Sequence, residues 1–122
     1  MNSYIAKLVF NIDINDGSHN SQFDEQWRLL FANSADEAFT KATHLGYKEE
    51  ESFLNKKLNQ IKWNLIGIPE VHLVDKLEDG VEILSSIHQN DDANNYIRFV
   101  KKKSENLLLK LKEQNFKNQT SA

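Results

Sequence analysis

The sequence predicts an α+β fold, with a four-stranded antiparallel sheet in β-β-α-β-β-α order, one helix packed on the sheet and a long C-terminal helix. Three observations predict it. Apolar and polar side chains alternate over residues 4–14 and 23–31, a capped amphipathic segment begins at Ser34, and alternation returns within residues 61–87. The strand order stays open, because the helix between the two hairpins can carry the second hairpin to either edge.

The first hairpin is predicted from two alternating runs joined by a polar turn cluster at residues 15–21. A slip of one residue would turn the apolar set of the second run to water, so we expect a well-specified register with Trp27 and Leu29 facing the core. The apolar side chains of that run are Phe23, Trp27, Leu29 and Phe31, and the polar ones are Asp24, Gln26 and Arg28.

Ser34-Ala35-Asp36-Glu37 is a capping box that predicts the start of a helix. In this motif the Ser34 hydroxyl accepts from the Glu37 amide, and the Glu37 carboxylate reaches back to the Ser34 amide. Small residues at helical spacing predict that the helix lies close to the sheet. Gly46 is a candidate C-cap. We favour the alternative that the helix continues to about Asn55 with a kink or break near Gly46, which leaves Glu49-Glu50-Glu51 as a solvated face.

The segment from Ile61 to Ile87 is predicted to be a long hairpin, because Asp79-Gly80 between two alternating runs is a strong hairpin signal. A bulge or bend, with a possible reversal of faces, is expected at Gly67-Ile68-Pro69, since proline cannot donate to a ladder. The alternating side chains are Ile61, Trp63, Leu65, Val71 and Leu73 on the first arm, and Val81, Ile83, Ser85 and Ile87 on the second.

Asp91 or Asp92 is expected to cap a last helix ending near Gln114, so that one α+β domain spans residues 1–114 and a polar, disordered tail spans 115–122. Apolar residues spaced alternately by four and three form a heptad-like seam in this helix. We expect the helix to pack against a second copy of the chain as a homodimer; the competing interpretation is that its apolar residues pack within one monomer. The expected interface residues are Ile97, Val100, Leu107, Leu108 and Leu111.

Trp27 and Trp63 are the candidate binding residues, since two tryptophans on adjacent strands can floor a pocket or a partner-binding face. The alternative, which we favour, is that both are core residues, because each lies on the same side of its strand as aliphatic neighbours. The residues expected to be largely buried are Leu8, Phe10, Trp27, Leu29, Phe39, Ala42, Trp63, Leu65 and Ile83.

His72, with Glu70 and Asp75 nearby, is the one candidate for acid–base catalysis. A strand histidine beside carboxylates is more often a solvent-facing neighbour. The four histidines show no metal-ligand spacing, and the two aspartates near His88 are better explained as helix caps. The sequence also has no nucleophile elbow and no glycine-rich phosphate loop, so we predict neither a cofactor nor a metal.

The charge is distributed unevenly. Residues 1–92 carry eight basic and sixteen acidic side chains, whereas residues 93–122 carry seven basic and two acidic ones. This asymmetry suits self-docking, assembly or an acidic partner, or simply the dipole of the last helix. A pI near 5.8 argues against nucleic-acid binding through that helix. The chain has no cysteine, no signal-peptide pattern and no apolar run of about 18 residues, so we expect a soluble, cytoplasmic protein.

Part of the sequence resembles a known family. The residues that carry the resemblance are Tyr4, Trp27, the run from Ala32 to Ala38, Ala42, Trp63, Gly67-Ile68 and the run from Glu78 to Glu82. They are similar to a bacterial family of domains of unknown function, number 4288, over residues 3–88. The chain departs from it at Leu58-Asn59-Gln60, where the family tends to have a glycine. The resemblance supports the β-β-α-β-β order and implies no activity.

Three classes of function remain. The observations favour a non-catalytic binding module, of regulatory or immunity type, that contacts a protein partner. The first alternative is a small enzyme that uses His72 and carboxylates on the central hairpin. The second, less favoured, is a nucleic-acid binder that uses the basic last helix.

Overall fold

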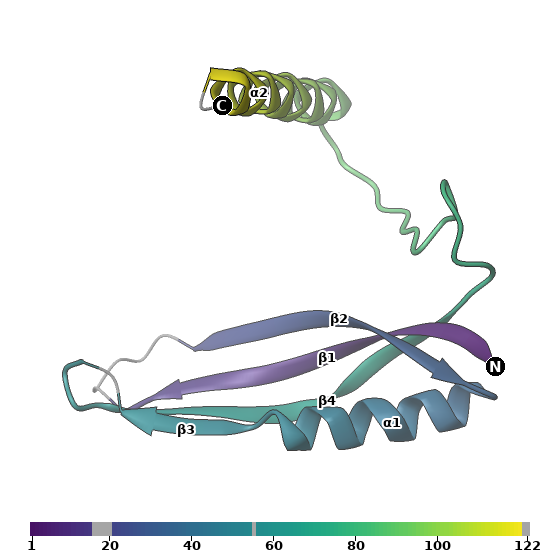
Figure 1. Cartoon of the computed structure of the whole chain (residues 1–122), viewed down its shortest axis with the longest axis vertical. Coiled ribbons are helices and arrows are strands. Elements are labelled where there is room, and N and C mark those ends of the chain that lie inside the picture. The colour runs from purple at the N-terminus through teal and green to yellow at the C-terminus, as the bar shows by residue number, and fades with distance from the viewer. Residues whose placement is uncertain (16–20, 55, 121–122) are drawn as a thin grey trace. The chain divides into compact units, whose positions relative to one another are not determined.

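The structure, a computed structural model, describes residues 1–15, 21–54 and 56–120, so most of the predicted turn at 15–21 lies outside the described residues. These residues divide into two compact units, 1–85 and 86–122, where the sequence predicts one domain over 1–114. The elements are β1 (Asn2–Ile14), β2 (Gln22–Ala32), α1 (Ala35–Lys48), β3 (Glu51–Leu54), β4 (Gln60–Val74) and α2 (Ala93–Thr120), as Figure 1 shows.

The four strands form one antiparallel sheet in the order β2-β1-β4-β3, which confirms the predicted fold class. β1 is paired on both sides, so that Ile5 lies opposite Leu29 of β2 and opposite His72 of β4. α1 runs along one face of this sheet (Figure 1). Near the start of β1 the consecutive residues Tyr4, Ile5 and Ala6 are all buried. Both faces of the strand are covered there, which explains why odd-numbered and even-numbered positions are apolar alike.

The predicted hairpin at residues 61–87 is right in its first arm and wrong in its second. β4 pairs with β1 as far as Val74, and then the chain leaves the sheet (Figure 1). The Asp79-Gly80 turn does form, with the Val81 amide donating to the Glu78 carbonyl at 3.1 Å, but no strand follows it before α2. Pro69 lacks a donor, which weakens the edge of β4 that a second arm would have used. The fourth strand is instead β3, which precedes β4 in the chain.

α1 ends at Lys48, not near Asn55 as predicted, and the following residues form β3. The Glu50 carboxylate accepts a hydrogen bond from the Leu65 amide at 2.9 Å, which draws the chain onto the edge of the sheet. Gly46 is helical and buried, and a Cβ there would lie 2.7 Å from both Cδ atoms of Leu65. The glycine therefore permits close approach of helix and sheet, which is a different role from the predicted kink.

The start of α1 is the predicted cap with one change. The Glu37 amide donates to the Ser34 hydroxyl at 3.1 Å, as expected. The Glu37 carboxylate accepts from the Asn33 amide at 3.1 Å, one residue earlier than the predicted Ser34 amide. Both contacts satisfy donors that would otherwise lack partners at the beginning of the helix.

The core lies between α1 and the sheet. Leu8, Phe10 and Ala42 are fully buried as predicted, and Trp63 and Leu65 are partly buried against them. The prediction is wrong for four residues that are 40–48% exposed, which are Trp27, Leu29, Phe39 and Ile83.

The error at β2 has a simple cause. Leu8 pairs with Gln26, and Lys7 pairs with Trp27. The alternate polar side chains of β2 therefore lie on the same face of the sheet as the core residues of β1. Side chains that are opposite one another in a ladder point to the same side of the sheet. The alternate apolar side chains of β2, which include Trp27 and Leu29, therefore point away from α1.

α2, taken by itself, begins after Asp92, whose carboxylate accepts from the Asn95 amide at 3.1 Å. It continues to Thr120, beyond the predicted end at Gln114, because no glycine or proline interrupts the sequence. At about 100° per residue, six large apolar side chains fall within about 120° of one another. We call this set the α2 stripe; all of its members are exposed, and they are Tyr96, Ile97, Val100, Leu107, Leu108 and Leu111.

Two leucines on β1 and β4 test the position of the core. Leu8→Ala should lower the free energy of unfolding by about 2–5 kcal/mol, because Leu8 is fully buried under α1. Leu73→Ala should lower it by less than about 1 kcal/mol, because Leu73 is exposed. Urea unfolding followed by circular dichroism measures both values. Equal losses in the two variants would contradict this position of the core.

Candidate functional site

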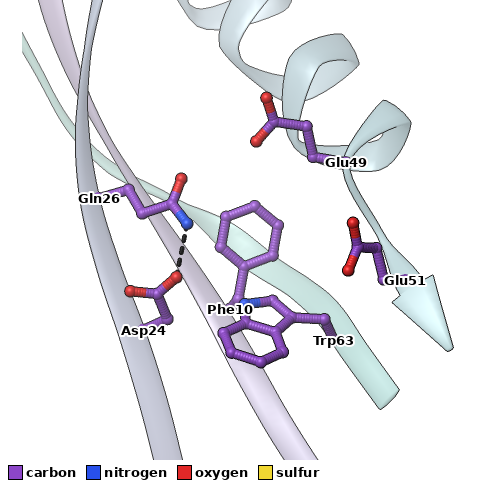
Figure 2. A pocket seen from close by; sticks show the side chains of 6 residues that line it. All are labelled: Phe10, Asp24, Gln26, Glu49, Glu51 and Trp63. Carbon is purple, nitrogen blue, oxygen red and sulfur yellow. Dashed lines mark hydrogen bonds between the residues drawn. The ribbon is translucent and has the colours of Figure 1, made fainter. Parts of the chain in front are cut away.

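A cavity of about 360 Å³ opens where α1 ends, on the face of the sheet that α1 covers (Figure 2). Trp63 and Phe10 form an aromatic wall, and carboxylate and amide side chains from β2 and from the chain between α1 and β4 surround it. The lining residues are Phe10, Asp24, Gln26, Glu49, Glu51 and Trp63.

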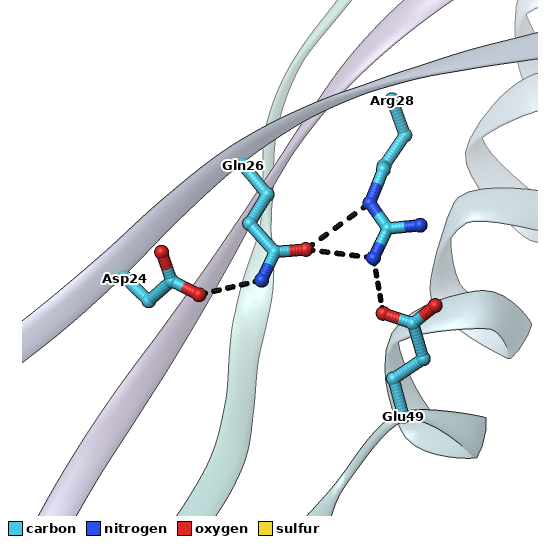
Figure 3. A network of polar contacts seen from close by, with 4 residues as sticks. All are labelled: Asp24, Gln26, Arg28 and Glu49. Carbon is cyan, nitrogen blue, oxygen red and sulfur yellow. Dashed lines mark hydrogen bonds and ion pairs between the residues drawn. The ribbon is translucent and has the colours of Figure 1, made fainter.

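A chain of polar contacts runs from β2 to the end of α1 (Figure 3). The Gln26 amide nitrogen donates to Asp24, and the Gln26 amide oxygen accepts from Arg28 Nε and Nη2 at 3.1 and 2.9 Å. Arg28 Nη2 also forms an ion pair with the Glu49 carboxylate. The three β2 residues are two positions apart, so they share one side of the strand. The network thereby ties β2 to the residue that ends α1.

Glu50 and Glu51 are exposed, as expected of a solvated face, and Glu49 is partly exposed, but these side chains also make contacts that the sequence did not predict. Glu49 pairs with Arg28, Glu50 accepts from the Leu65 amide, and Glu51 lines the cavity. The helix stops before these residues, so their side chains no longer share a helical surface. Carboxylates beside an aromatic wall have the chemistry to attract a cation, and Arg28 already supplies one. The sequence signal for this arrangement was the alternation of polar residues in β2.

His72 lies on the opposite face of the sheet. Its Nε2 atom is 3.0 Å from Glu70 Oε1, so the predicted proximity to a carboxylate is confirmed for Glu70. Its side chain is 40% exposed, and its ring centroid lies 5.9 Å from that of Trp27. A general base works best in an enclosed site that excludes water, and this pair lies open to solvent. The geometry therefore gives no support to acid–base catalysis at His72.

Lys7 joins this group of side chains. Its Nζ atom lies 3.2 Å from Glu25 Oε2, 3.9 Å from Glu70 Oε2 and 5.8 Å from the centre of the Trp27 ring. Lys7 and Glu25 played no part in the sequence prediction, because their proximity depends on pairing between three strands. They surround Trp27 with charge on a surface that carries both apolar side chains and polar ones such as Asn11 and Asn64.

Trp27 and Trp63 do not share a pocket, and the prediction that their strands are adjacent is wrong. β1 lies between β2 and β4, and the two rings lie on opposite faces of the sheet. Trp63 packs against the core and lines the cavity, whereas Trp27 is 40% exposed. Of the two tryptophans, Trp27 is therefore the one more accessible to a macromolecular partner.

Trp27 belongs to an apolar surface on the side of the sheet away from α1, which we call the open face. Ile5 in the centre of this side is buried, while the large side chains of the neighbouring edge strand β2 are exposed. Surfaces of this kind commonly mark sites of protein association. The apolar residues of the open face are Val9, Phe23, Trp27, Leu29, Phe31 and Ile66.

A hollow of about 280 Å³ lies on the open face around Gly67, where a Cβ atom would meet nothing within 4 Å. Val9, Ile66 and Pro69 are among the residues that line it. The register of β1 with β4 shifts on both sides of Val9, which confirms the predicted irregularity near Gly67. The irregularity replaces a side chain with open space, so the hollow can receive a side chain from another molecule.

A family model described as "Domain of unknown function (DUF4288)" matches residues 3–85 of the chain. The chain belongs to this family. The match ends where the first compact unit ends, so the DUF4288 domain contains the sheet, α1, the cavity and the open face, and α2 lies beyond it. No curated protein and no solved structure matches the chain.

The predicted interface residues Ile97, Val100, Leu107, Leu108 and Leu111 all lie in α2, outside the DUF4288 domain, and all are exposed. Neither helix in the described part of the chain has the length and apolar character needed to cross a membrane. Among the described residues, the structure contains no group of three or more His, Asp or Glu side chains arranged to hold a metal ion.

The contact between Arg28 and Glu49 should contribute little to stability. Both side chains are about one-third exposed, and ion pairs of this kind are typically worth less than about 1 kcal/mol. A double-mutant cycle with Arg28→Gln and Glu49→Gln, measured by urea unfolding, should give a coupling below about 1 kcal/mol that falls as salt is added. A larger coupling that does not respond to salt would show that the pair is shielded from water.

Proposed function

We propose that this protein is a non-catalytic interaction module of the bacterial cytoplasm that works as a homodimer, with α2 packed against a second copy of the chain. The observation that carries the proposal is the α2 stripe, a set of six apolar side chains along one side of a 28-residue helix, all of them exposed. A protein of this size with such a surface gains free energy by covering it, at about 25 cal/mol for each Å² removed from water.

The form of the stripe supports a defined partner over nonspecific contact. Spacings of four and three residues, which run through Ala93, Ile97, Val100, Ser104, Leu107 and Leu111 with Ser104 as the one polar member, are those of helices that pack in register. Most of the stability of helices in proteins comes from the packing of an amphipathic face and not from intrinsic helix propensity. The regular structure of α2 is therefore best explained by a surface that covers the stripe.

Charge supports a second copy as the occupant. Residues 93–122 carry a net charge of +5, and residues 1–92 carry −8. A copy of the same chain thus offers an acidic body to the basic helix, which favours the encounter and its orientation more than the final affinity. In a two-fold dimer each chain contributes the same pair of surfaces, so both helices are covered at once.

Light scattering and sedimentation of the full chain at micromolar concentration test the proposal. The expected mass is twice the 14.2 kDa of one chain. Replacing Leu107 and Leu111 by lysine should raise the dimer dissociation constant at least about tenfold, because two charges would enter the apolar contact.

Leu109→Lys is the matched control. Leu109 is exposed like the stripe leucines, but it lies about 160° around the helix from Leu111. This variant should keep the dimer. A monomer of the unaltered chain at these concentrations would refute the proposal, and a dimer that persists after the double replacement would place the interface elsewhere.

A further inference from the structure

We propose that the open face of the sheet is the docking surface for α2 of a second copy. This inference rests on the proposed self-association and names where the helix binds. The open face and the α2 stripe both carry large exposed apolar side chains, and every copy of the chain has one of each surface. If two copies exchange helices, each open face is covered by the α2 stripe of the other copy. No such surface is then left exposed, as in a closed two-fold dimer.

The two surfaces match in length. From Phe23 to Phe31 the open face extends for about 26 Å along β2, at about 3.3 Å per residue. From Ile97 to Leu111 the stripe extends for about 21 Å, at 1.5 Å per residue. A single helix of this length can therefore lie along the apolar side of the edge strand and contact most of it.

The shapes also fit. The hollow around Gly67 is lined almost entirely by apolar side chains and has open space where other residues would place a Cβ. The stripe presents leucines, whose side chains fill recesses of this kind when helices pack on sheets. A flat sheet face would offer no equivalent recess, so the irregularity in β4 gives the docking surface a defined register.

Acidic side chains within the open face are opposite in charge to basic side chains beside the α2 stripe. On the open face the carboxylates of Glu25 and Glu70 stand on either side of Lys7. On α2, Lys101 and Lys103 lie at helical positions that border the α2 stripe, one on each side. Because Lys7 partly neutralises the carboxylates, these charges orient the helix more than they strengthen its binding.

The segment that joins the first compact unit to α2 is seven residues long, 86–92. Fully extended, a segment of that length reaches about 23 Å, which lets α2 extend from its own unit toward a second copy.

The natural chain has no cysteine, so single cysteines report which surfaces meet. Gly67→Cys places a thiol in the hollow of the open face, where space is available. Leu107→Cys places one in the α2 stripe, and Phe39→Cys places one on α1 as the control. Full-length single-cysteine variants are mixed in pairs, one carrying a mass tag, oxidised gently, and separated on a non-reducing gel.

The expected product is a mixed disulfide between the Gly67→Cys and Leu107→Cys chains. The pair of Phe39→Cys with Leu107→Cys should give far less of it. If Leu107→Cys chains link only to one another, the helices pair directly, and the inference fails while the proposed homodimer stands. If a chain carrying both Gly67→Cys and Leu107→Cys closes on itself and remains a monomer, the inference and the proposed homodimer both fail.

A second measurement uses two phenylalanines that are equally exposed, Phe31 on the open face and Phe39 on α1, each at 48%. Phe31→Lys should raise the dimer dissociation constant at least about tenfold, whereas Phe39→Lys should leave it within about twofold. Sedimentation of both variants decides the matter, with circular dichroism confirming that each is folded. Equal effects, or none from Phe31→Lys, would overturn the inference even if the dimer itself is real.

Discussion

The pairing of Lys7 with Trp27, and of Leu8 with Gln26, sends alternate side chains of β2 to opposite faces of the sheet. This register places Asp24, Gln26 and Arg28 on the side of α1. The core there is therefore built from β1, β4 and the small residues of the helix, with Leu30 and Ala32 at the end of β2. The same register turns four large apolar side chains of β2 away from the helix. A shift by one residue would exchange the two faces, so the chemistry of both surfaces depends on this single alignment.

On the side of α1, the polar side chains of β2 connect the sheet to the end of the helix. Asp24, Gln26 and Arg28 form a continuous set of contacts that reaches Glu49, where the helix ends and the chain turns into β3. The contacts close the region where the helix no longer covers the sheet. The remaining space is the cavity beside Trp63, whose carboxylates are partly neutralised by Arg28. The end of α1 is thus held by polar contacts, while its middle is held by apolar packing around Ala42.

On the other side, the sheet has a surface that a small monomer would not be expected to leave in water. The α2 stripe presents the same problem at the other end of the sequence. Each apolar surface alone is an aggregation hazard, and the proposed exchange of helices would cover both at once. The family match covers the sheet and α1 but not α2, so the helix is an addition to the DUF4288 domain that supplies the second of these surfaces.

Local patterns in the sequence were sufficient for several features. The alternation in residues 4–14 and 23–31 predicted β1 and β2, the Ser34 cap predicted the start of α1, and the absence of helix breakers allowed α2. These features depend on interactions between residues that are close together in the chain, such as the hydrogen bond from the Glu37 amide to Ser34. The fold class followed from their order.

Tertiary structure decided the rest, because ladder pairing depends on segments far apart in the chain. The Asp79-Gly80 turn formed without its second strand, since a turn is local and an arm needs an available edge. The strands of Trp27 and Trp63 are separated by β1, and the local sequence around either tryptophan does not indicate this strand order. Alternation in β2 showed that it has an apolar side, and only its hydrogen bonds to β1 determined that this side faces away from α1.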